Sequence, residues 1–220
     1  MIRCCIFDLD GTILDTITTI TYYVNLIFDR RGIERVTNDE CKYFAGNGAR
    51  TLIARALKSK GITDSCLSEE ILREYMAAYD EAPLYLTEPF AGIRDMLNAL
   101  KERGIKLAVL SNKPDTATKS VVKHFFDGVF DEAVGGIEGV PLKPDPTAAR
   151  AILKKLGISE NETAWIGDTS TDIETGKNLG ASISIGVLWG FRECSELEAA
   201  GADAIVGSAN EIVREVLRVD

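Results

Sequence analysis

Histidine is almost absent from the chain, since His124 is the single imidazole among 220 residues. It falls within a helical pattern, far from the end of any expected strand. A catalytic triad that depends on histidine is therefore disfavoured. The five cysteines are odd in number and form no CxxC pair, so neither a disulfide framework nor a zinc site is expected. This use of cysteine favours a reducing compartment.

Long apolar runs and clusters of basic residues are also missing. The longest uncharged stretch, Thr16 to Phe28, is too short to cross a bilayer and suits one amphipathic helix. The chain has 25 basic and 34 acidic residues, a formal charge of -9, without a block of Lys or Arg. Nucleic acid is disfavoured as a partner, because binding it requires a basic surface. We also expect no membrane association, no signal peptide and a cytoplasmic location.

What the sequence does contain is an acidic turn near its start. An apolar run reaches Phe7 and is followed by Asp8, Asp10, Gly11 and Thr12. Residues two apart in a strand share a face, so both carboxylates point into one small volume where the strand ends. Two acids this close favour a bound cation or a shared proton. An ordinary Asp-Gly turn is the alternative interpretation of this stretch alone.

Two kinds of local pattern follow this turn. Residues 15–83 show helical spacing and no convincing strand, whereas helices and strands alternate from residue 84 onward. Single helices between strands imply parallel crossovers, and therefore a doubly wound, Rossmann-like α/β sheet with helices on both faces. The sequence predicts a catalytic core formed by residues 1–14 and 84–220, with an all-helical cap domain inserted at 15–83.

Polar residues follow the first expected strand and two later ones, Lys106–Leu110 and Thr163–Ile166. Ligands of doubly wound sheets bind beyond the carboxyl ends of the strands, so these polar groups are expected to converge. The groups in question are Asp8, Asp10, Ser111, Lys143, Asp168 and Asp172. Several carboxylates, one hydroxyl and one ammonium suit Mg²⁺ holding a phosphate, and they suit zinc poorly.

With histidine set aside, a carboxylate is the expected nucleophile. Its attack on a phosphoryl group brings two anions together, and a metal ion with Lys143 would neutralise them. Asp10 could protonate the leaving alkoxide and later accept a proton from water. Structural roles stay open as well, since Ser111 could cap a helix and Lys143 could be a solvated loop residue. Asp168 and Asp172 could be the acids at a helix start.

Four short motifs resemble, in order along the chain, those of the haloacid dehalogenase superfamily: FDLDGT at 7–12, LSN at 110–112, LKPDP at 142–146 and IGDTSTD at 166–172. The resemblance extends along essentially the whole chain, including the helical insert, and it implies an enzyme. The dehalogenase branch lacks an acid at the position of Asp10 and uses no metal. The resemblance therefore favours phosphate chemistry.

Carried over residue by residue, the resemblance implies that Asp8 is the nucleophile and a Mg²⁺ ligand. Asp10 would be the general acid and base, with its backbone carbonyl on the metal. Asp168 would be a further metal ligand, and Asp172 would support Lys143 or a metal-bound water. The residues assigned to substrate binding are Thr12, Ser111, Asn112, Lys143 and, from the insert, Arg50.

Further stretches resemble phosphoglycolate phosphatases and their pyrophosphatase-like relatives, namely SNKP at 111–114 and residues 175–192. That branch often has AxxAG after the fourth motif, whereas Gly176 and Leu179 stand at the two alanine places here, which we interpret as a packing change. The loop at 46–50 is similar to one that faces the active site in this branch. Arg50 could bind a substrate carboxylate or a second phosphate, or form a surface salt bridge.

These observations predict a Mg²⁺-dependent phosphatase of a small phosphorylated metabolite, a monomer or homodimer, with phosphoglycolate as the best single substrate. Alternatives on the same fold are a sugar-phosphate mutase resembling β-phosphoglucomutase, an inorganic pyrophosphatase-like enzyme and a nucleotide phosphatase. A receiver-like signalling or phosphate-sensing module would pair similar groups. Such modules lack the helical insert and the acid two residues beyond the phosphorylated one.

Overall fold

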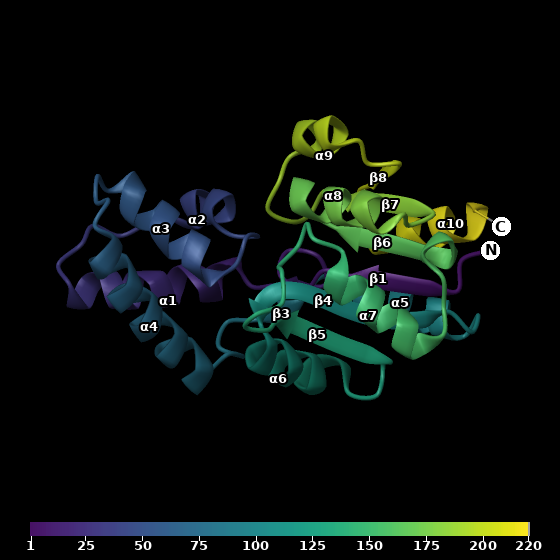
Figure 1. Ribbon diagram of the computed structural model, residues 1–220, viewed down its shortest axis with the longest axis horizontal. Coiled ribbons are helices and arrows are strands. Elements are labelled where there is room, and N and C mark those ends of the chain that lie inside the picture. The colour runs from purple at the N-terminus through teal and green to yellow at the C-terminus, as the bar shows by residue number, and fades with distance from the viewer. Residues whose placement is uncertain (220) are drawn as a thin grey trace.

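The computed structural model describes residues 1–219 and contains a six-stranded parallel sheet (Figure 1). Its order is β5-β4-β1-β6-β7-β8, so the first strand of the chain has neighbours on both sides. The strands are β1 (Cys4–Phe7), β4 (Lys106–Pro114), β5 (Glu132–Gly136), β6 (Thr163–Gly167), β7 (Ile183–Val187) and β8 (Ala204–Val206). The non-sequential order confirms the predicted doubly wound sheet.

Helices cover both faces of this sheet because its strands are apolar on both sides (Figure 1). Cys4 and Ile6 point to the face that packs against α7 (Thr147–Leu156) and α8 (Ser170–Leu179). Cys5 and Phe7 point to the opposite face. The helices of that face are α5 (Ile93–Lys101), α6 (Asp115–Phe126) and α10 (Ala209–Arg218).

Four helices precede the alternating part of the chain and lie to one side of the sheet (Figure 1). They are α1 (Ile17–Arg30), α2 (Asn38–Phe44), α3 (Ala49–Ser59) and α4 (Ser65–Glu81). A short antiparallel ribbon of β2 (Leu14–Asp15) and β3 (Glu88–Pro89) brackets them. Their apolar faces build a separate cluster around Phe28, Ile53 and Ile71. The division of the chain at residues 15 and 83 into core and cap stays a prediction.

The structure differs from the sequence-based expectation in three places, and the first of them bears on the site. β4 does not end at Leu110 but continues to Pro114, which pairs with Gly136 of β5 after a shift in register. A helix that the sequence analysis missed, α9 (Cys194–Ala200), packs against α8. A short 3-10 helix, Glu160–Glu162, precedes β6.

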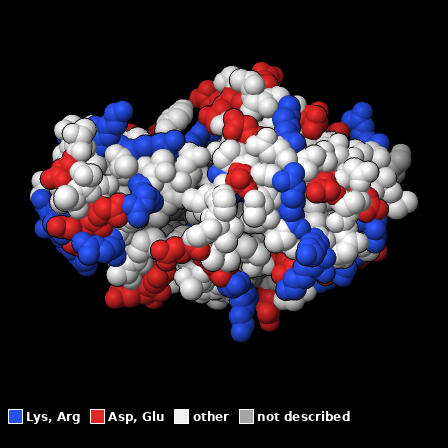
Figure 2. Space-filling model, in the orientation of Figure 1, with Lys and Arg blue, Asp and Glu red and all other residues white. Residues whose placement is uncertain are grey.

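Charged side chains of both signs are interspersed over the face of the molecule drawn in Figure 2, and neither sign covers that face. Within residues 1–219, no helix is both long enough and apolar enough to cross a membrane.

Candidate active site

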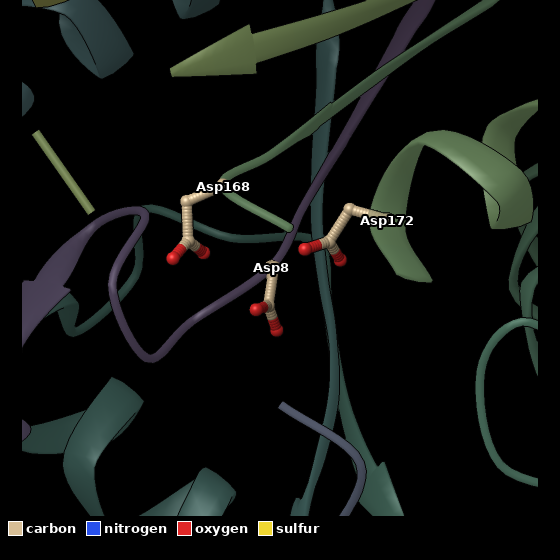
Figure 3. A group of neighbouring side chains, drawn as sticks. All are labelled: Asp8, Asp168 and Asp172. Atoms are coloured by element: carbon tan, nitrogen blue, oxygen red, sulfur yellow. The ribbon is translucent and has the colours of Figure 1, made fainter. Parts of the chain in front are cut away.

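Three aspartates converge at the carboxyl end of the sheet (Figure 3). Asp8 follows β1, Asp168 follows β6, and Asp172 lies in the first turn of α8. One carboxylate oxygen from each lies within 4.8 Å of the others, and all three residues are buried. The parallel neighbours β1 and β6 end together, which is why segments far apart in sequence deliver their acids to one place.

Asp168 is held rigidly from two sides. Its Oδ1 accepts a 2.8 Å hydrogen bond from the hydroxyl of Thr12, and its Oδ2 accepts one of 2.8 Å from the backbone N–H of Phe191. Gly11 has φ +87°, and a Cβ there would lie 2.4 Å from Asp168 Oδ2. At Gly190 a Cβ would lie 2.3 Å from the Cβ of Asp168. Two loops therefore approach Asp168 so closely that only glycine fits at these positions.

Lys143 links two of the three acids. Its Nζ lies 2.7 Å from Oδ1 of Asp8 and 2.7 Å from Oδ1 of Asp172. Burial alone would lower the pKa of this ammonium, but Asp172 and then Asp8 raise it above its usual value. The other oxygen of Asp172 accepts hydrogen bonds from the backbone and the hydroxyl of Thr169, at 3.1 and 2.7 Å. Asp172 thus orients Lys143, with both of its oxygens engaged.

The cluster carries more negative charge than Lys143 offsets. Burial is the largest cause that raises the pKa of Asp8, to about 7. Lys143 acts to lower this pKa, and the nearby charge of Asp172 acts to raise it. Burial, and then Asp172 and Asp8, raise the pKa of Asp168 well above its usual range. A divalent cation between Asp8 and Asp168 would offset this charge, and carboxylate oxygens are ligands that hard cations prefer. The residues present therefore fit a metal ion.

Asn112 ties the sheet to the helical segment. Its Nδ2 donates to the backbone carbonyl of Gly46 at 3.0 Å and to that of Lys143 at 3.2 Å. Its Oδ1 accepts from the backbone N–H of Lys143 at 2.8 Å. A second link joins Asn47 Nδ2 to the hydroxyl of Thr171 at 2.9 Å. These bonds hold residues 46–47 over the end of the sheet.

A cavity of about 60 Å³ lies between the strand ends and the helical segment; we call it the Asp8 chamber. Its lining includes Asp8, Asp10, Ser111, Asn112, Lys113 and Tyr79. Five predicted site residues are thereby collected at or beside one small space: four line it, and Lys143 reaches it through its contact with Asp8.

Two residues that the sequence analysis assigned to substrate binding take other positions. Thr12 is fully buried and donates its hydroxyl proton to Asp168, so it lies behind this predicted metal ligand and outside the chamber lining. Arg50 lies on the surface of α3, with its side chain 68% exposed and paired with Glu69. The structure therefore shows the surface salt bridge that was the alternative role for Arg50, because this side chain lies on the outer face of α3. His124 is exposed on α6 beside Phe125.

The sequence analysis missed Lys113 and Tyr79. Lys113 Nζ lies 3.1 Å from Oδ1 of Asp10 and donates a 2.6 Å hydrogen bond to the hydroxyl of Tyr79. Both side chains are buried. The signal that could have found Lys113 is its position directly after Asn112, within the SNKP stretch.

The model of the haloacid dehalogenase-like hydrolase family matches residues 5–185. The chain belongs to this family. Among haloacid dehalogenase-like hydrolases, it is 34% identical to the phosphoglycolate phosphatase of Aquifex aeolicus over 190 residues, which cover 86% of each chain. It is 28% identical to the phosphoglycolate phosphatase of Aliivibrio fischeri over 209 residues, covering 93% of this chain and 92% of that protein. The predicted family and the prediction of an enzyme are confirmed.

Solved structures agree with this family assignment. A crystal structure from Lactobacillus delbrueckii subsp. bulgaricus, of a protein provisionally described as a phosphoglycolate phosphatase, has a TM-score of 0.93 and is 32% identical, covering 97% of this chain and 98% of that one. A structure from Thermotoga maritima, provisionally described as a β-phosphoglucomutase, has a TM-score of 0.73 at 23% identity and covers 100% of both chains. The second likeness shows the shared fold alone.

Proposed function

We propose that the chain is a Mg²⁺-dependent phosphatase that hydrolyses a small organic phosphomonoester through a phosphorylated Asp8, with phosphoglycolate as the best candidate substrate. The observation that carries this proposal is the buried carboxylate of Asp8, paired with Lys143 and facing a small chamber. The relatives named phosphoglycolate phosphatase, at 34% and 28% identity, support the choice of substrate.

In the first half-reaction, an oxygen of Asp8 attacks phosphorus and the bond between phosphorus and the ester oxygen breaks. Asp10 gives a proton to the leaving oxygen, which departs as an alcohol. Lys143 stays beside Asp8 and offsets the negative charge that the phosphoryl group brings. Ser111 and the backbone at Asn112 bind phosphoryl oxygens in this proposal, which their position in the lining of the chamber supports.

In the second half-reaction, water attacks the same phosphorus atom and the bond to Asp8 breaks. Asp10, now a carboxylate, accepts a proton from that water, so the enzyme returns to its starting state with release of inorganic phosphate. One acid thus serves both steps, which explains why an acid two residues beyond Asp8 is needed.

The residues that would hold Mg²⁺ are Asp8, Asp168 and the backbone carbonyl of Asp10. When bound, the ion would offset the charge of the phosphoryl group and of the buried acids. Thr12 and Phe191 fix the orientation of Asp168 through the hydrogen bonds that both of its oxygens accept.

The Asp8 chamber has a volume of about 60 Å³ and is open toward solvent. Its volume therefore sets no limit on the length of the leaving group. The choice of phosphoglycolate over a sugar phosphate or a nucleotide rests on the named relatives and on the substrate comparison that follows.

A phosphate-release assay tests the proposal. The purified protein, with Mg²⁺, is presented in parallel with phosphoglycolate, glucose 6-phosphate, a nucleoside monophosphate and pyrophosphate. We expect the highest kcat/KM for phosphoglycolate and loss of detectable turnover in Asp8→Asn. The matched control is Asp39→Asn, which makes the same change at a side chain that is 88% exposed. Release of phosphate by Asp8→Asn at the wild-type rate would refute the proposal.

A further inference from the structure

Lys113 is a buried cation for which the proposed chemistry has no role. It lies near the end of β4, and its side chain is 5% exposed. Among the described residues that line the Asp8 chamber, it is the only Lys, Arg or His. Lys143, the other ammonium of the site, is already flanked by Asp8 and Asp172. A second negative charge on a substrate would therefore meet Lys113 first.

The contacts of Lys113 put its ammonium beside the position of the leaving group. Its Nζ lies 3.1 and 3.2 Å from the two oxygens of Asp10, the acid that protonates the leaving oxygen. Any group attached to that oxygen through one or two carbon atoms comes within reach of the same ammonium. Without Lys113, a substrate carboxylate there would have no cation beside it, which is unfavourable in a buried site.

Tyr79 of α4 fixes the ammonium from the helical segment. Its hydroxyl accepts a 2.6 Å hydrogen bond from Lys113 Nζ, and the ammonium also lies 4.4 Å from the centroid of the tyrosine ring. Lys113 Nζ has three acceptors, the two oxygens of Asp10 and the hydroxyl of Tyr79, so a substrate carboxylate would be attracted by its charge and would replace one of the two contacts to Asp10. Arg50, the other cation considered for this task, points away from the chamber.

We infer that Lys113, oriented by Tyr79, is the residue that selects a leaving group carrying a carboxylate one or two carbons from the ester oxygen. This inference rests on the proposed phosphatase function and names the class of substrate that the phosphatase would recognise. The substrate class is a phosphorylated hydroxy acid of two or three carbons. The charge of Lys113 sets the preference for the acid, and its closeness to Asp10 sets how far the carboxylate can lie from the ester oxygen.

The test compares phosphoglycolate with 2-hydroxyethyl phosphate, an ester of similar length whose leaving group carries no charge, by the ratio of their kcat/KM values. We expect wild type to prefer the acid and Lys113→Met to lower the ratio by roughly 10- to 100-fold, the size of a lost hydrogen bond to a charged group. Tyr79→Phe is a milder second variant, which keeps the ring and is expected to lower the ratio several-fold. The matched control is Lys119→Met, since Lys119 also pairs with an aspartate, Asp115, but is exposed on α6.

The ratio separates recognition of substrate from an effect on Asp10. If Lys113→Met slows both esters equally and leaves the ratio unchanged, Lys113 acts only through Asp10 and the inference is wrong. A wild-type enzyme that hydrolyses both esters equally well also refutes it, while the phosphatase proposal stands. Failure of wild type to hydrolyse any phosphomonoester refutes the proposed function itself.

Discussion

Thr12 donates its hydroxyl proton to Oδ1 of Asp168 at 2.8 Å, across 156 positions of sequence. The bond joins the loop after β1 to the loop after β6 and holds the expected metal ligand from behind. Outer partners of this kind set the orientation and affinity of a metal site. The first motif therefore contributes to the site twice, through the acids that face the chamber and through a hydroxyl that faces away from it.

We predict that Thr12→Val weakens metal binding. Valine keeps the shape but leaves Asp168 Oδ1 without its donor, so the Mg²⁺ concentration for half-maximal activity should rise about 10-fold, with a smaller change in rate at saturating metal. Titration of activity and of binding heat with Mg²⁺ measures this shift. Thr116→Val, at an exposed position of α6, is the control. An unchanged metal dependence in Thr12→Val would contradict this role.

The stability of the metal-free protein should fall as the pH rises from 5 to 8. Burial raises the pKa of Asp8 to about 7 from 3.8, so the folded state binds the proton more tightly than the unfolded state does. The stabilisation from this group is complete below pH 3.8 and is lost as pH rises through about 7. Asp168, whose pKa is also raised by burial, adds to the same trend.

Thermal denaturation in EDTA at several pH values measures this trend. We expect a midpoint that decreases toward pH 8 in wild type, a shallower decrease in Asp8→Asn, and recovery at pH 8 when Mg²⁺ is added. A midpoint that rises with pH in EDTA would show that the buried acids are not held in their protonated form.

Gly176 is required by its neighbours on the sheet. A Cβ at this position would lie 2.3 Å from Oγ of Ser184 and 2.8 Å from Cβ of Trp165. We predict that Gly176→Ala lowers the free energy of unfolding by about 1–3 kcal/mol without changing the substrate ratio. The close contacts at Gly176 support the interpretation that glycine stands at this alanine place for reasons of packing.

Urea denaturation of single and double variants tests the contact directly. Ser184→Ala removes the nearest atom, so the double variant Gly176→Ala, Ser184→Ala should recover part of the loss, which a double-mutant cycle reports as coupling. Gly207→Ala is the control, because nothing lies within 4 Å of a Cβ there and its φ is not positive. If the changes in the free energy of unfolding at positions 176 and 184 simply add, the clash is relieved by a movement elsewhere.

The sheet and the three converging acids could be predicted from sequence because both depend on local rules. Apolar runs with polar residues at their ends define strands, and the right-handed crossover places those ends at one edge. The placement of Asp8 and Asp168 follows from these rules without knowledge of any side-chain contact. The helical character of residues 17–81 followed from spacing alone.

The partners of Lys113 could not be predicted in the same way. Its position on a strand depends on β4 continuing past Leu110, which in turn depends on pairing with β5. Its contact with Tyr79 depends on where α4 lies relative to the end of β4, and no periodicity encodes that arrangement. α9 escaped prediction because it is 7 residues long and buries only Leu197, too little to produce a helical pattern.

The most direct test of the central claim is to trap the enzyme during turnover. The protein is mixed with phosphoglycolate and Mg²⁺, quenched in acid, digested, and analysed by mass spectrometry. We expect one phosphoryl group on the peptide that carries Asp8, and none on Asp8→Asn. A phosphoryl group found on another residue, or rapid turnover by Asp8→Asn, would contradict the account.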